Sequence, residues 1–147
     1  RDLGVALSFE NCPMLFRNDE WPGGHNIAYS PKIWRRIFEE WGDVVGMNFD
    51  PSHLIWQMID QTRFIEEFGN KFAHVHAKDL MIDRDGLYNN GILSAGMGWQ
   101  VPRLCGLGEV NWSGFFSGLK LAGYGCASGC ACLFVALPSL ATRSFVW

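Results

Sequence analysis

The chain has 147 residues with 12 lysines and arginines against 15 aspartates and glutamates, which gives a formal net charge of −3. Non-specific nucleic-acid binding depends on a basic surface, so this acidic balance predicts no nucleic-acid partner. The five cysteines lack the spacing of a disulfide framework, which indicates a reducing, cytoplasmic compartment.

The chain starts at Arg1 rather than methionine, shortly before an apolar run, which indicates a piece of a longer protein. That run, Leu3–Phe9, is too short for a signal peptide and is followed at once by Glu10. The apolar stretch near the C-terminus is too short to span a membrane and is interrupted by Pro138. We therefore expect no membrane partner.

Three apolar runs each end in a side chain of a type that binds metal ions. Leu3–Phe9 leads into Glu10, Val44–Asp50 ends in its own carboxylate, and Phe72–Lys78 carries His76 near its end. Apolar runs of this length predict buried strands. Three strands that end in this way predict one site.

Alternation along these strands divides each into a bulky face and a small or polar face. Ser8, Asn48 and His74 precede the three ligand-type residues by two positions, so they share the polar face with them. We expect these three to orient the ligands from one layer below. The bulky face is expected to meet helices.

Helical spacing of apolar residues, with capping residues at the ends, predicts the helices. They run from Pro31, after Ser30 as N-cap, to Gly42; from about Met58 to Glu67; and from Asn111 or Ser113 to about Leu121. The segments Leu15–Ser30 and Asp83–Leu107 have loop composition and are predicted to be loops. Within them, Trp21–Asn26 and Asp83–Leu107 are expected to determine specificity.

The order strand, helix, strand, helix, strand, long loop, helix is typical of βα units on a parallel sheet, an α/β fold. A doubly wound sheet and a TIM barrel both fit that order. Ligands at the carboxyl ends of successive strands, above polar side chains, favour a partial TIM barrel.

Two carboxylates and an imidazole suit Mn²⁺, Mg²⁺, Co²⁺ or Zn²⁺. Such an ion polarises a carbonyl, and Glu10 then acts as acid or base on the adjacent carbon, which predicts proton abstraction next to a carbonyl. Taken singly, each residue also has a structural explanation: a salt bridge for Glu10, a cap for Asp50, a core histidine for His76. Lys78 either binds substrate or forms an ion pair with Asp79.

The segments FENCP, NFDPSHL, HVHAKD and GLGEVNW resemble the sugar phosphate isomerases/epimerases of the xylose-isomerase-like TIM-barrel superfamily, over about residues 3–124. The resemblance implies that the predicted strands are the fifth, sixth and seventh of a barrel. It implies a metal ion held by Glu10, Asp50 and His76, a carbohydrate substrate touched by His53, and a fourth ligand, a glutamate after the eighth strand.

That glutamate has no counterpart here. Residues 125–147 contain no Asp, Glu or Lys and carry Cys126, Cys130 and Cys132. A shift of this kind resembles translation in the wrong reading frame, although a cysteine metal site is an alternative. We therefore predict the C-terminal part of a barrel over residues 1–124 and an aberrant tail over residues 125–147, in place of the eighth strand.

The predicted function is a divalent-metal-dependent isomerase or epimerase of a keto sugar, sugar phosphate or cyclitol derivative, with this chain inactive by itself. The alternative from another class is a truncated or degenerate barrel without activity, whose exposed strand edges promote homo-oligomers. A cyclitol dehydratase is a further alternative. An abasic-site endonuclease-like barrel is disfavoured because residues 83–98 contain no histidine and the chain is acidic.

Overall fold

The computed structural model describes residues 7–13, 26–94 and 98–125. The predicted aberrant tail, apart from its first residue, lies outside these ranges. In chain order the elements are β1 (Leu7–Glu10), α1 (Pro31–Trp41), η1 (Gly42–Val44), β2 (Val45–Phe49), α2 (Ser52–Trp56), α3 (Gln61–Phe68), η2 (Gly69–Lys71), β3 (Phe72–Val75), β4 (Asp79–Ile82), α4 (Arg84–Asn90), η3 (Ile92–Ser94), β5 (Gln100–Arg103) and α5 (Trp112–Leu121).

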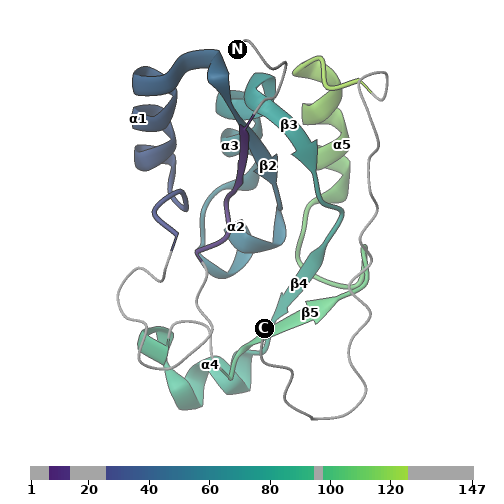
Figure 1. Cartoon of the computed structure of the whole chain (residues 1–147). Coiled ribbons are helices and arrows are strands. Elements are labelled where there is room, and N and C mark those ends of the chain that lie inside the picture. The colour runs from purple at the N-terminus through teal and green to yellow at the C-terminus, as the bar shows by residue number, and fades with distance from the viewer. Residues whose placement is uncertain (1–6, 14–25, 95–97, 126–147) are drawn as a thin grey trace.

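The predicted parallel sheet is confirmed. β1, β2 and β3 lie side by side in that order, and both neighbouring pairs run parallel (Figure 1). Glu10 pairs with Asn48, and the amide of His76 donates to the carbonyl of Phe49 at 2.8 Å. The residues that end the three strands therefore meet at one edge of the sheet.

Helices cover one face of this sheet. Figure 1 shows α1 and α5 on either side of it and α3 behind it. The bulky side chains of β2, Val45, Met47 and Phe49, are buried in the resulting core, as predicted. Phe49 stacks on Phe72 with ring centroids 4.4 Å apart. Burial of an aromatic side chain of this size contributes about 1.5–3 kcal/mol, so this face holds the sheet and helices together.

The bulky face of β1 is less covered than predicted. Leu7 and Phe9 are 55% and 39% exposed. Phe9 does reach α1, where its ring lies 6.2 Å from that of Trp41. This ring contact joins the bulky face of β1 to α1, as predicted, while much of that face stays exposed.

A bulge in β3 adjusts its register against β2. The pairing shifts between Met47 and Asn48, so that Phe72 faces Met47 and His74 faces Asn48. Bulged strands place an extra residue between paired positions, and here it is Ala73. A Cβ atom at Gly46 would lie 2.7 Å from the Cβ of Ala73, so the bulge requires glycine at that position.

The prediction of a loop over Asp83–Leu107 is wrong. α4 and β5 both lie in this segment, and β5 pairs antiparallel with β4. Asp83 caps α4 by accepting the amides of Asp85 and Gly86, and Gly91, with φ 66°, ends the helix. A helix of two turns is too short for its apolar period to stand out among glycines and asparagines.

Two other predicted boundaries are also wrong. The second helix begins at Gln61 rather than Met58, because Asp60 caps it by accepting the amide of Arg63. Met58 instead adopts a positive φ of 56° between α2 and α3. β3 ends at Val75 rather than Lys78, and the chain resumes as β4 in the second sheet.

The hairpin of β4 and β5 has its own small core. Trp99, which is 1% exposed, packs edge-on against Trp56, together with Leu80 and Ile82. Pro102 of β5 pairs with Leu80.

Asp79 joins this hairpin to the segment that precedes α5. Its carboxylate is fully buried and accepts hydrogen bonds from the amides of Leu80, Gly106, Gly108 and Val110 and from the indole N–H of Trp112.

Candidate metal centre

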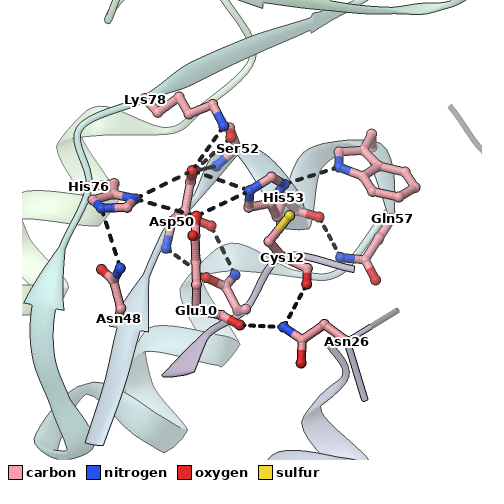
Figure 2. Close-up of polar contacts among 12 residues, drawn as sticks. Glu10, Cys12, Asn26, Asn48, Asp50, Ser52, His53, Gln57, His76 and Lys78 are labelled. Carbon is pink, nitrogen blue, oxygen red and sulfur yellow. Dashed lines mark hydrogen bonds and ion pairs between the residues drawn. The ribbon is translucent and has the colours of Figure 1, made fainter. Parts of the chain in front are cut away.

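Four predicted side chains converge at the carboxyl edge of the sheet (Figure 2). Nε2 of His53 lies 3.4 Å from Oε1 of Glu10 and 3.4 Å from Oδ2 of Asp50. Nδ1 of His76 lies 3.4 Å from Oε1 of Glu10 and 3.8 Å from Oδ2 of Asp50. The structure therefore brings two carboxylates and two imidazoles from three strand ends and α2 to one point.

The two oxygens of Asp50 have different surroundings. Oδ1 accepts the amide of Ser52 at 2.9 Å and its hydroxyl at 2.6 Å, a turn that α2 continues. Oδ2 faces the other donors, with Nζ of Lys78 at 3.3 Å. Lys78 thus forms its ion pair with Asp50, whereas Asp79 accepts the hydrogen bonds described above.

Two asparagines that sequence reasoning missed hold the ligand-bearing segments. Asn11, fully buried, accepts the amide of Asp50 at 2.7 Å and donates to its carbonyl at 2.9 Å. Asn26 donates to the carbonyls of Glu10 and Cys12 at 2.8 and 2.7 Å. Asn11 follows Glu10 directly, so its position next to a predicted ligand was the available signal. Asn26 carried no signal, because it falls in a segment predicted to be a loop.

His53 is held from α2. Nε1 of Trp56 contacts its Nδ1 at 3.5 Å, and Gln57 donates to its carbonyl at 2.6 Å. His76 is contacted by Asn48, whose Nδ2 lies 3.3 Å from its Nε2, and by the ring of His74. Asn48 and His74 thus occupy the layer below the ligands that the alternation predicts.

Opposite charges stabilise one another across this cluster. Burial alone raises the pKa of Asp50, but the neighbouring His76, His53 and Lys78 outweigh it and hold that pKa well below its usual range. Burial alone lowers the pKa of His53, but Cys12 and the two carboxylates raise it to about 9. The neighbouring His53 lowers the pKa of Glu10, and the Asp50 carboxylate raises the pKa of His76.

These side chains fit a divalent cation. Donor atoms of Glu10, Asp50 and His53 all lie within 4.8 Å of one another. Among the described residues, Oδ2 of Asp50 and Nε2 of His53 are buried and make no hydrogen bond, although buried polar atoms normally do; their charged neighbours lie 3.3–3.8 Å away. Carboxylates and imidazole suit Mn²⁺, Mg²⁺, Co²⁺ or Zn²⁺. Glu10, Asp50 and His53 therefore form a group able to hold a metal ion, with His76 beside it.

The sequence of residues 1–133 matches the family described as xylose isomerase-like TIM barrel. The chain belongs to that family. This confirms the predicted resemblance and the predicted fold class, an α/β fold with parallel strands that alternate with helices.

Two similar proteins show how much of a longer chain this one spans. This chain is 35% identical to the uncharacterized protein YfiH of Bacillus subtilis strain 168 over 106 residues. The matched region is 67% of this chain and 34% of YfiH. The crystal structure of a xylose isomerase domain protein from Planctomyces limnophilus superposes with a TM-score of 0.57 at 20% identity, over 84% of this chain and 37% of that one. The chain thus spans about a third of the length of these relatives.

Within the described ranges, no helix is both long enough and apolar enough to cross a membrane.

Proposed function

We propose that this chain supplies the metal centre of a divalent-metal-dependent isomerase or epimerase. The substrate is a keto sugar, a sugar phosphate or a cyclitol derivative, and the reaction begins with removal of a proton next to a carbonyl. One observation carries the proposal: the side chains of Glu10, Asp50, His53 and His76 converge. Among the described residues, two of their buried metal-binding atoms, Oδ2 of Asp50 and Nε2 of His53, make no hydrogen bond. Membership of the xylose isomerase-like barrels supports it.

The position of each residue indicates its role in the proposed reaction. Glu10 and Asp50 would hold the ion with one imidazole: either His76, the ligand that the family resemblance implies, which leaves His53 for the substrate, or His53 itself, whose Nε2 forms the compact group with the two carboxylates. When bound, the ion polarises a carbonyl and its neighbouring hydroxyl. The Glu10 side chain is 34% exposed, whereas that of Asp50 is fully buried, so Glu10 is the carboxylate that can reach substrate carbon and move its proton. Lys78 and the imidazole that is not a ligand lie within reach of the same oxygens and would bind the substrate hydroxyls.

Isothermal titration of the chain with Mn²⁺, Mg²⁺, Co²⁺ and Zn²⁺ tests the metal centre. Glu10→Gln and Asp50→Asn keep the shape of each side chain but remove its charge. Each should weaken binding by about 100-fold or more, which corresponds to about 2.7 kcal/mol. Glu40→Gln, at an exposed position on α1, is the matched control and should bind as the unchanged chain does. Equal affinity in all four proteins would refute the centre.

Incubation with ketohexoses and a ketocyclitol in D₂O tests the reaction. The chain by itself is expected to be inactive, so ion-dependent entry of deuterium into the carbon next to the carbonyl, abolished in Glu10→Gln, would show that these residues suffice to remove the proton. Because the chain spans about a third of its relatives, binding of the ion without exchange would restrict the proposal to the metal centre.

A further inference from the structure

Ser52 holds one oxygen of the Asp50 carboxylate. Its main-chain amide donates to Oδ1 of Asp50 at 2.9 Å, and its hydroxyl donates to the same oxygen at 2.6 Å (Figure 2). Both residues are fully buried, so water does not compete for these two hydrogen bonds. Ser52 is the first residue of α2, and the ring of Pro51 restricts the backbone between the two residues. The turn therefore holds the carboxylate in one orientation.

The two oxygens of this carboxylate differ in what they can still bind. A carboxylate oxygen has two lone pairs, and the two hydrogen bonds from Ser52 use both lone pairs of Oδ1. Oδ2 makes no hydrogen bond among the described residues and lies 3.4 Å from Nε2 of His53. Chelation of an ion by both oxygens would require Oδ1 to give up a hydrogen bond from Ser52.

The number of oxygens that a carboxylate offers affects which ion it suits. Ca²⁺ takes about six to eight oxygen ligands and often two from one carboxylate, whereas smaller divalent ions take fewer. We propose that Ser52 is a positioning residue that occupies Oδ1 of Asp50, so that this carboxylate binds the ion through Oδ2 alone and the centre discriminates against Ca²⁺. This rests on the proposed function, in which Asp50 is a ligand.

Infrared spectroscopy of the Mn²⁺-loaded chain reads this mode of binding directly. The gap between the antisymmetric and symmetric carboxylate stretches is wide when one oxygen binds the ion and narrow when both do. In protein labelled with ¹³C at the aspartate carboxyl groups, the Asp50 bands, assigned by their loss in Asp50→Asn, should show the wide gap. A narrow gap would overturn the proposal, and this measurement needs no variant of Ser52.

Ser52→Ala removes the hydroxyl and frees one lone pair of Oδ1. The gap should narrow in this variant, and Mn²⁺ should bind about 10–100-fold more weakly by titration calorimetry. Ser52→Thr keeps the hydroxyl and should keep the wide gap. Ser117→Ala, exposed on α5, is the control for the serine-to-alanine change itself.

Competition between ions separates positioning from a general loss of structure. The Ca²⁺ concentration that displaces half of the bound Mn²⁺, followed by the EPR signal of free Mn²⁺, should be about 10–100-fold lower for Ser52→Ala at equal Mn²⁺ occupancy. A purely structural role would weaken both ions alike and leave this concentration unchanged, which would overturn the proposal.

The two proposals fail differently. A chain that binds no divalent ion would refute the metal centre and the role of Ser52 with it. Mn²⁺ binding with a narrow gap in the unchanged chain, or with the same gap in Ser52→Ala, would refute the role of Ser52 and leave the centre intact.

Discussion

Replacement of Asp79 by asparagine should destabilise the chain strongly. In Asp79, Oδ1 accepts the amides of Leu80 and Val110, and Oδ2 accepts those of Gly106 and Gly108 and the indole of Trp112, all at 2.8–3.0 Å. An asparagine keeps the shape but has one oxygen and one NH₂ group. Whichever way the amide turns, its NH₂ group then faces donors that it cannot accept from.

The contacts set the size of the effect. The less damaging orientation places the NH₂ group at Oδ1, where two N–H groups lose their acceptor. An unsatisfied buried donor costs about 1–3 kcal/mol, so Asp79→Asn should lower the free energy of unfolding by about 2–6 kcal/mol. The backbone of Gly108 lies close against this carboxylate, since a Cβ added at Gly108 would lie 2.3 Å from Oδ1 of Asp79.

Urea unfolding of the chain, followed by tryptophan fluorescence, measures this difference. The matched control is Asp43→Asn, whose carboxylate is 81% exposed in its ion pair with Lys71 and should matter by less than about 1 kcal/mol. Equal stability of the two variants would refute the role assigned to Asp79.

The same carboxylate predicts an acid dependence. Burial alone raises the pKa of Asp79, but the indole of Trp112 and the backbone amides outweigh it and lower that pKa below its ordinary value. A lowered folded-state pKa gives stability that is present above the unfolded pKa, about 3.9, and is lost as the pH falls below it. The stability gap between the unchanged chain and Asp79→Asn should therefore narrow as the pH falls from about 5 to about 2. A constant gap would contradict this assignment.

Three further changes test other parts of the fold. Gly46→Ala should cost about 1–3 kcal/mol in urea unfolding, because its Cβ would lie 2.7 Å from that of Ala73. Trp99→Ala should lower the free energy of unfolding by about 3–5 kcal/mol. It should accelerate hydrogen exchange of the β4 and β5 amides more than that of the β2 amides, and an equal acceleration in both would contradict a separate small core. Asn11→Leu removes the two hydrogen bonds from the Asn11 side chain to the amide and carbonyl of Asp50. It should weaken Mn²⁺ binding, measured by titration calorimetry, about 10–100-fold. Unchanged affinity would show that Asn11 does not support the centre.

Elements with a strong apolar period were predictable from the sequence. α1 begins at Pro31 after Ser30 and ends before Gly42, and α5 begins after Asn111, as expected. Ser30 has the extended backbone of an N-cap, although its side chain makes no capping hydrogen bond. Short elements were not predictable, since α4 and β5 depend on capping by Asp83 and on burial of Trp99 in a small separate core.

The candidate site was predictable where chemistry and strand ends coincide. Glu10, Asp50, His53, His76 and Lys78 all lie together, because parallel strands bring their carboxyl ends to one edge. Asn11 and Asn26 could not be inferred in the same way. A side chain that hydrogen-bonds to main-chain atoms depends on the path of the backbone, and it leaves no spacing pattern in the sequence.

Pro102 of β5 limits pairing of the β4–β5 hairpin with strands of other molecules. The carbonyl of Leu80 accepts the amide of Glu109 and its amide donates to Asp79, so neither main-chain group of Leu80 points at β5. In an antiparallel pair the residue opposite then also turns its main chain outward, which places the nitrogen of Pro102 on the outer edge of β5. An incoming strand finds no donor at that position, so edge-to-edge aggregation is disfavoured on this side of the hairpin.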